Sequence, residues 1–194
     1  MFTQAGLFLL DALIGFLTFA LLLRFYMQAF RVSFRNQVGA FVVQLTNWLV
    51  MPLRKGLPGL FGLDLASVLP AYLLQVLLLF VVFLLRGGLD VAATGNLPGL
   101  IFWTALLATL RISVYLLIGA LFLQAILSWV SSHSPLAQPL AQLTRPFLDP
   151  IRRIVPPIAA IDLSPLIAIL LAQVVLIFLS WLPKGSRNVT GIRG

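Results

Sequence analysis

Two identically spaced pairs of charged residues carry most of the chemistry that this sequence could perform. Arg54 precedes Asp64 by ten residues, and Arg152 precedes Asp162 by the same ten residues. A guanidinium and a carboxylate at this spacing can form an ion pair if the chain between them folds back. The candidate chemistry is therefore electrostatic, and it occurs twice.

Catalysis is a weak alternative, because few side chains could act as acid, base or nucleophile. The chain has one His, five acidic residues, all Asp, and no Cys. The single histidine, His133, lies in a Ser- and Pro-containing turn with no acidic residue nearby in the sequence. Neither a metal-ligand spacing nor a Gly-rich phosphate loop occurs. We expect no catalytic, cofactor-binding or metal-binding residues, no cofactor and no enzymatic activity.

The composition indicates that these pairs belong to an integral membrane protein. Hydrophobic residues make up 61% of the chain and charged residues only 9%, whereas about a quarter of an average globular chain is charged. The net charge is +8. In a membrane protein such an excess of basic residues usually lies in loops that face anionic lipid headgroups, so we do not expect nucleic-acid binding. The expected partners are the lipid bilayer and anionic lipids, with other membrane proteins or a second copy of the chain as alternatives.

The charged pairs lie in two copies of one stretch. Sliding the chain by 98 residues aligns residues 44–76 with residues 142–174 without a gap, and Pro, Arg, Asp and Gln are among the identical positions. Such residues seldom coincide by chance in a Leu-rich sequence. The sequence therefore predicts a tandem duplication, with repeat 1 at residues 1–88, repeat 2 at residues 89–183 and a polar tail at residues 184–194.

Each repeat is expected to contain a transmembrane helix, an interfacial amphipathic segment and a second transmembrane helix. Apolar runs of sufficient length predict four transmembrane helices, at residues 5–30, 67–86, 98–130 and 165–182. The third is favoured as one long helix, although residues 97–110 could instead form a separate re-entrant segment. The expected fold class is an all-α membrane protein.

The two linking segments combine helically spaced apolar residues with polar ones, which predicts amphipathic helices in the membrane surface. We expect Pro52 and Pro58 to break the first, and Pro146 and Pro150 to break the second, which Pro156-Pro157 then closes. Ser67 and Ser164 are the expected N-caps of the spans that follow. The residues expected to shape the two hairpins are Pro52, Pro58, Asp64, Pro150, Pro156, Asp162, Ser164 and Pro165.

Three roles remain open for the basic ends of these segments, Arg54-Lys55 and Arg152-Arg153. They could serve only to hold the hairpin together, each arginine pairing with its aspartate. They could bind anionic lipid headgroups, at about 1 kcal/mol per basic residue. They could also dock a protein partner.

Polar residues inside the spans have two interpretations. The glutamines Gln28, Gln75, Gln124 and Gln173 indicate either hydrogen bonds between helices or the lining of a permeation path. The first interpretation is favoured, since charge inside the spans is low. Arg24, near the end of the first span, is expected to snorkel to the interface.

The distribution of basic residues predicts the orientation. The side with both interfacial segments carries seven basic residues: Arg31, Arg35, Arg54, Lys55, Arg145, Arg152 and Arg153. The opposite side carries four: Arg86, Lys184, Arg187 and Arg193. The positive-inside rule therefore favours cytoplasmic interfacial segments, with both termini outside.

The duplicated motif resembles a known family. Pro150-Ile151-Arg152-Arg153, followed by Asp162-Leu163-Ser164-Pro165, and the weaker first copy, Pro52-Leu53-Arg54-Lys55 followed by Asp64-Leu65, are similar to the motif of the YggT family, also called YlmG. The resemblance covers about residues 5–182. In the first copy Gly56 stands where a bulky apolar residue is usual, and Ala66-Ser67 replaces Ser-Pro.

The resemblance implies a multi-pass protein of the bacterial inner membrane with no established enzymatic activity. Members of the family are associated with osmotic stress and ion uptake, with cell division or nucleoid distribution, and in plastids with cytochrome assembly. We expect a non-catalytic membrane scaffold or interaction protein whose basic hairpins contact lipid headgroups or a protein partner. The alternative is a small channel or transporter subunit linked to osmotic or ion homeostasis.

The two Arg–Asp pairs also make a prediction about stability. If each pair closes its hairpin at the interface, removing one partner should destabilise the protein. The second copy is expected to suffer more, because Pro157 and Pro165 leave its backbone fewer alternatives than Gly59 and Ser67 leave the first copy.

Overall fold

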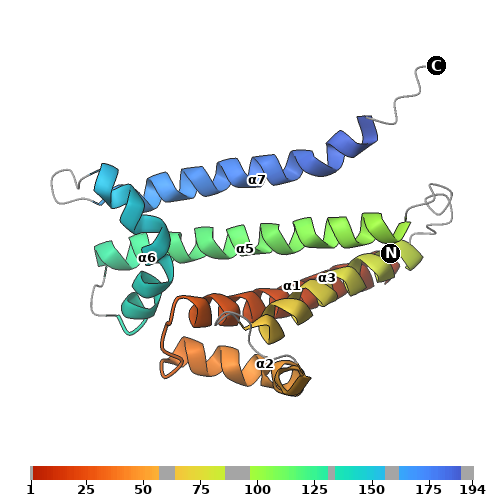
Figure 1. The fold of residues 1–194 in the computed structure, drawn as a ribbon, viewed down its shortest axis with the longest axis horizontal. Coiled ribbons are helices and arrows are strands. Elements are labelled where there is room, and N and C mark those ends of the chain that lie inside the picture. The colour runs from red at the N-terminus through yellow and green to blue at the C-terminus, as the bar shows by residue number, and fades with distance from the viewer. Residues whose placement is uncertain (1, 57–63, 86–96, 131–133, 156–161, 189–194) are drawn as a thin grey trace. The chain divides into compact units, whose positions relative to one another are not determined.

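A computed structural model describes residues 2–56, 64–85, 97–130, 134–155 and 162–188 of the 194-residue chain. This described part is all α-helical, with six helices and no strand. The helices are α1 (Phe2–Ala29), α2 (Gln37–Gly56), α3 (Leu65–Leu85), α5 (Leu97–Val130), α6 (Ala137–Ile154) and α7 (Ser164–Asn188) (Figure 1). They belong to two compact units, Met1–Ser113 and Val114–Gly194, which divide within α5.

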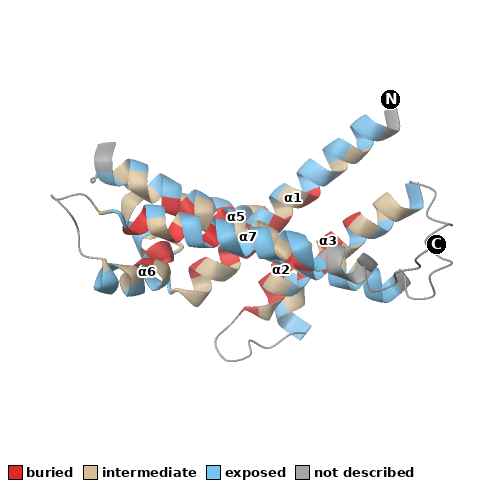
Figure 2. Cartoon of the chain, turned by 90° about the horizontal axis from the view of Figure 1, so that it is seen from above, coloured by how far each residue is buried: buried red, intermediate tan, exposed pale blue. Residues whose placement is uncertain are grey.

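Four of the described helices are long and apolar enough to cross a membrane. These spans are Gln4–Ala29, Leu65–Leu85, Pro98–Ser128 and Ser164–Leu182. Large apolar side chains such as Phe80 and Phe178 are exposed on them, and Figure 2 shows exposed residues along the long helices. Such apolar surfaces are stable in the hydrocarbon of a lipid bilayer. An α-helix can cross this layer because its backbone N–H and C=O groups form their hydrogen bonds within the helix. The protein is therefore a membrane protein.

The four predicted spans are confirmed, and the alternative for the third is wrong. Residues 97–110 are not a separate re-entrant segment, because α5 runs without interruption from Leu97 to Val130. Pro98 lies in the first turn of α5, where its missing N–H has no intrahelical acceptor. The predicted repeat boundary after residue 88 lies outside the described residues.

Pro52, Pro146 and Pro150 do not break the amphipathic segments, contrary to the prediction, whereas Pro58, Pro156 and Pro157 lie outside the described residues. Pro52 lies inside α2, which continues to Gly56, and Pro146 and Pro150 lie inside α6. The apolar span ends at Leu182, as predicted, but Pro183 does not end the helix, because α7 continues to Asn188. A proline removes one helical hydrogen bond without preventing the helix from continuing. Packing of an apolar face, which stabilises most protein helices, maintains these helices on both sides of the proline.

The first unit is built on α1 and α3, which pack against each other, with α2 in contact with both. Buried Ala20, Ala66 and Ala71 allow close packing, as small residues do between membrane helices. The turn into α2 is tight: the Asn36 carboxamide accepts the Gly39 N–H at 2.7 Å, which makes Asn36 the N-cap. A Cβ on Gly39 would lie 2.6 Å from the Phe34 backbone, so glycine is required there.

The second unit contains the rest of α5 together with α6 and α7. Helix α6 contacts α7. A small buried cluster joins the three helices, with Leu121 from α5, Leu148 from α6 and Ala168 from α7. Both linking segments are therefore helices with buried residues on one side, Val42 and Val50 on α2 and Leu143 and Leu148 on α6. Their basic last turns lie beside the start of the following span, and their place in the membrane surface stays a prediction.

Candidate functional site

An ion pair closes the first hairpin. Arg54 lies in the last turn of α2, and Asp64 immediately precedes α3. Arg54 Nη2 is 2.5 Å from Asp64 Oδ2, and Arg54 Nε donates to Oδ1 at 3.4 Å. The Ser67 hydroxyl donates to Oδ2 at 2.8 Å. The expected pair forms, and Ser67 lies in the first turn of α3 instead of capping it. We call Arg54, Asp64 and Ser67 the first clamp.

The first clamp extends into the span α1. Arg54 Nη2 also donates to Gln28 Oε1 at 3.0 Å. Arg24, one turn earlier, is only 4% exposed, so the prediction that it snorkels is wrong. Its Nη1 donates to Thr46 Oγ1 at 2.8 Å and to Asn47 Oδ1 at 3.0 Å, both on α2. Among the described residues its buried Nε has no hydrogen-bond partner.

The environment keeps Asp64 ionised. Burial alone would raise the pKa of this carboxyl group, but hydrogen bonds from Arg54 and Ser67, together with the charges of Arg54 and Arg24, outweigh burial and lower the pKa below its ordinary value. One carboxylate therefore faces two arginines, so this cluster has a net positive charge.

The second hairpin is closed in the same way but is more exposed. Arg152 Nη2 is 2.7 Å from Asp162 Oδ2, and Nε donates to the same oxygen at 2.9 Å. The Ser164 backbone N–H donates to Asp162 Oδ1 at 3.0 Å. Ser164 is the first residue of α7 rather than the residue before it, so it is not the N-cap. We call Arg152, Asp162 and Ser164 the second clamp. Asp162 is 33% exposed, whereas Asp64 is 5% exposed.

The second carboxylate is also kept charged. Burial raises the pKa of Asp162, but the donors of Ser164 and Arg152 and the charge of Arg152 outweigh burial and lower it. On the same amphipathic helix, Arg145 and Asp149 form an exposed pair at 3.1 Å, one helical turn apart. Such exposed pairs contribute little to stability.

The four glutamines do not share one role. Gln75 is buried and donates from α3 to Thr18 on α1 at 3.1 Å, a hydrogen bond between two spans. Gln28 contacts Arg54, and Gln124 accepts a hydrogen bond from the Thr144 hydroxyl. Both therefore join a span to an amphipathic helix. Gln173 is exposed on α7.

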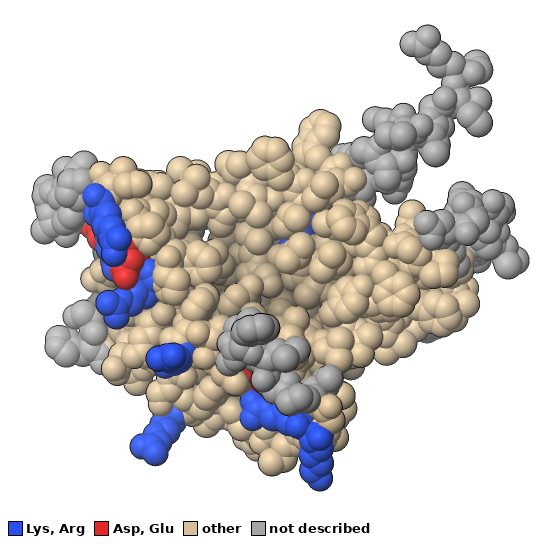
Figure 3. All heavy atoms as spheres, viewed as in Figure 1, with Lys and Arg blue, Asp and Glu red and all other residues tan. Residues whose placement is uncertain are grey.

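The basic residues next to each clamp are exposed. Lys55 and Arg153 have no ion pair with any described residue. Figure 3 shows the visible Lys and Arg side chains over α6 and around α2, and almost none over the spans. Within the described ranges no group of His, Cys, Asp and Glu could hold a metal ion.

Several predicted positions lie outside the described residues or have no special geometry. Pro58, Pro156 and His133 are outside the described ranges. Pro52 and Pro150 are exposed within their helices, and Pro165 is buried in the first turn of α7. Sequence reasoning missed the role of Arg24. A cation inside an apolar run, combined with polar Thr46 and Asn47 on the next amphipathic segment, is the signal that could have indicated it.

Comparison with known proteins decides the family. The CCB3/YggT family profile matches residues 3–85 and 103–183, most of the chain. The chain belongs to the CCB3/YggT family. An "Uncharacterized protein YggT" of Escherichia coli (strain K12) is 39% identical over 170 residues, which cover 87% of this chain and 85% of that protein. No solved structure matches significantly.

Further relatives agree with this assignment. An uncharacterized Vibrio alginolyticus protein, named for the region 3′ of proC, is 37% identical over 82% of this chain and 85% of its own length. An uncharacterized Pseudomonas aeruginosa protein is 34% identical over 88% of this chain and 86% of its own length. This YggT-family chain therefore resembles bacterial proteins over nearly its whole length, and the names of these relatives assign no activity.

Proposed function

We propose that this YggT-family protein is a non-catalytic membrane scaffold whose basic hairpins contact anionic lipid headgroups or a protein partner. The observation that supports it is the pair of clamps. Each clamp fixes the last turn of an amphipathic helix while its arginine remains half exposed, 45% for Arg54 and 41% for Arg152. Lys55 and Arg153 stand beside them. Cations fixed at a membrane surface attract anionic headgroups.

The proposal includes a tandem arrangement. Two stretches that match one family profile support two copies, at residues 1–88 and 89–183, each with an even number of crossings. Both amphipathic helices then lie on the same side of the bacterial inner membrane. The excess of basic residues near them favours the cytoplasmic side, with both termini outside.

Headgroup contact is tested outside the clamps, so that the hairpins stay intact. Thermal unfolding is measured in nanodiscs of phosphatidylcholine with and without phosphatidylglycerol. We expect phosphatidylglycerol to stabilise the wild type, and the double variant Lys55→Gln, Arg153→Gln to lose about 2 kcal/mol of that gain. Arg145→Gln is the matched control, because Arg145 is exposed on α6 outside both clamps. An equal response of the wild type and the double variant to phosphatidylglycerol would refute headgroup contact.

The alternative function, a small channel or transporter subunit, makes a different prediction. It requires ion flux through protein-containing liposomes, and Gln75→Leu should reduce that flux if the glutamine lines the path. Gln75 is buried and bonded to Thr18, which supports a structural role. We expect no flux above that of empty liposomes. Flux that Gln75→Leu abolishes would favour the channel over the scaffold.

A further inference from the structure

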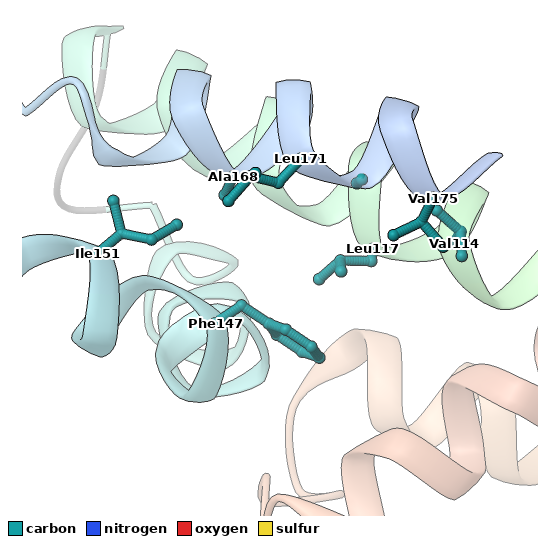
Figure 4. A pocket seen from close by; sticks show the side chains of 8 residues that line it. Val114, Leu117, Phe147, Ile151, Ala168, Leu171 and Val175 are labelled. Carbon is teal, nitrogen blue, oxygen red and sulfur yellow. The ribbon is translucent and has the colours of Figure 1, made fainter. Parts of the chain in front are cut away.

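An apolar groove lies within the second unit, between the spans α5 and α7 and beside the amphipathic helix α6. Its volume is about 320 Å³, within the range of small-molecule sites. Its main lining side chains are Val114 and Leu117 of α5, Phe147 and Ile151 of α6, and Ala172 and Val175 of α7. Figure 4 shows side chains from all three helices around one space. Every lining residue is apolar.

Small side chains on α7 leave this space open. Ala172 lines the groove, and the aligned position 98 residues earlier, in α3, is Leu74. In the first unit α1 and α3 pack against each other, and Gln75 bonds across them to Thr18. In the second unit Gln75 aligns with Gln173, which is exposed. In the upstream span the offset is 96 residues, as for Gln28 and Gln124, so Thr18 aligns with Val114, which lines the groove.

The surroundings of the groove indicate its occupant. A water molecule needs two to four polar partners, and the groove lining has no polar side chain. Two of its walls are spans, so hydrocarbon is the surrounding solvent. The third wall, α6, continues directly from Ile151 into the basic residues Arg152 and Arg153. An apolar slot beside a basic interfacial turn complements a lipid with an apolar chain and an anionic head.

We propose that the groove binds an acyl chain of an anionic phospholipid, whose phosphate lies at the last turn of α6. The second clamp holds this turn in place, because Asp162 pairs with Arg152. Arg153 then supplies a positive charge that no described acidic residue neutralises. The inference rests on the proposed headgroup contact and adds a specific chain-binding site to it.

Lipid retention by the purified full-length protein tests the site. Native mass spectrometry compares dioleoyl-phosphatidylglycerol with dioleoyl-phosphatidylcholine. Ala172→Leu fills the groove with the residue that the first half carries, and Val174→Leu, on the exposed face of α7, is its control. We expect Ala172→Leu to reduce phosphatidylglycerol retention several-fold and Val174→Leu to leave it unchanged. Arg153→Gln should reduce the preference for phosphatidylglycerol about fivefold.

The outcomes separate this site from general headgroup contact. If Ala172→Leu retains phosphatidylglycerol like the wild type while Arg153→Gln loses it, the groove site is refuted and headgroup contact stands. If both variants behave like the wild type, the groove site and the headgroup contact at the second hairpin both fail. If Ala172→Leu reduces both lipids equally and Arg153→Gln changes nothing, the groove holds lipid chains without selecting an anionic head, which overturns the site proposed here.

A measurement on the wild type covers the case in which Ala172→Leu does not fold. Phosphatidylglycerol with a photoreactive acyl chain is crosslinked in nanodiscs, and the labelled peptides are identified. We expect labels on Leu117, Phe147 and Ile151, in excess of those on exposed Leu170. Labels spread evenly over all lipid-facing residues would overturn the site.

Discussion

The two clamps use the same residue types in different surroundings. In each, an arginine of an amphipathic helix pairs with an aspartate before the next span, and a serine two or three residues later donates to that carboxylate. Ser67 donates through its hydroxyl, and Ser164 through its backbone N–H. Asp64 is nearly fully buried, whereas a third of Asp162 is exposed. The same motif therefore holds one carboxylate buried and the other partly exposed. We expect this burial to determine how much each ion pair contributes to the stability of the fold.

The neighbouring spans also differ between the two units. In the first unit the Thr46 hydroxyl accepts from the buried cation Arg24. In the second unit the equivalent Thr144 meets the neutral amide of Gln124. The first span aligns with the third at an offset of 96 residues, which matches Gln28 with Gln124. At this offset the residue that corresponds to Arg24 is Ala120. The first hairpin therefore contains one more buried positive charge, which its single carboxylate helps to balance.

Removing the carboxylates should give the largest difference in stability between the two clamps. Asp64→Asn leaves two arginines without their counter-charge, one of them buried, and we expect it to lower the free energy of unfolding by about 3 kcal/mol. Asp162→Asn acts at a partly exposed pair, and we expect a loss of under about 1 kcal/mol. The measurement is thermal unfolding in detergent micelles.

The control is Asp149→Asn, which removes an exposed carboxylate from a pair one helical turn apart and should change stability little. The double variant Asp64→Asn, Arg54→Gln should lose less than the sum of the two single variants, because the residues interact. Equal losses for Asp64→Asn and Asp162→Asn would mean that burial does not distinguish the clamps.

The threonines next to the clamps should show the next largest difference. Thr46→Val removes an acceptor from the buried guanidinium of Arg24, and a lost hydrogen bond to a charged group costs about 2 kcal/mol. Thr144→Val removes a neutral hydrogen bond to Gln124, and we expect about 1 kcal/mol. Both changes keep the side-chain shape. Chemical denaturation of the two variants in one detergent compares them, and a larger loss for Thr144→Val would contradict the role assigned to Arg24.

Acid should reproduce part of the carboxylate effect in the wild type. The pKa values of Asp64 and Asp162 are lowered in the folded protein, so the folded state binds these protons less readily than the unfolded state does. Their contribution to stability is complete above the unfolded pKa of about 3.9 and is lost as the pH falls through the lower folded pKa.

The measurement is the unfolding temperature of the wild type, Asp64→Asn and Asp162→Asn between neutral pH and the acid limit of the detergent. The loss on acidification should be smaller in Asp64→Asn and in Asp162→Asn than in the wild type, because each variant lacks one of the two carboxylates whose pKa is lowered. An identical acid response of the wild type and Asp64→Asn would show that Asp64 does not titrate in this way.

Much of this arrangement was predictable from the sequence, because its causes are local. Apolar length alone gave the four spans, and the ten-residue spacing was sufficient to predict both Arg–Asp pairs. The depth of each pair was not predictable, since it depends on which side chains the neighbouring span brings against it. The expectation that the second clamp would be the more sensitive relied on Pro157 and Pro165, whereas the burial of Asp64 favours the first clamp.

The errors at the prolines have a similar origin. Pro52, Pro146 and Pro150 were expected to break their helices, because a proline cannot donate its helical hydrogen bond. That rule concerns the isolated chain. In the fold, buried Val50 and Leu148 beside these prolines hold the apolar faces of α2 and α6 against their units. Tertiary packing therefore outweighs a local penalty that the sequence shows clearly.

The smallest expected difference concerns Gln75 and Gln173, which are aligned in the sequence but not equivalent in the structure. Gln75→Leu removes the hydrogen bond to Thr18 between α3 and α1, and such bonds between membrane helices contribute about 0.6 kcal/mol on average. Gln173→Leu removes an exposed amide from an apolar face, so the protein should be as stable as the wild type or slightly more stable. Thermal unfolding of both variants in one detergent, with Thr18→Val as the partner deletion, measures the difference. Thr18→Val and Gln75→Leu should be non-additive. A loss for Gln173→Leu that equals the loss for Gln75→Leu would mean that Gln173 has a partner in the membrane.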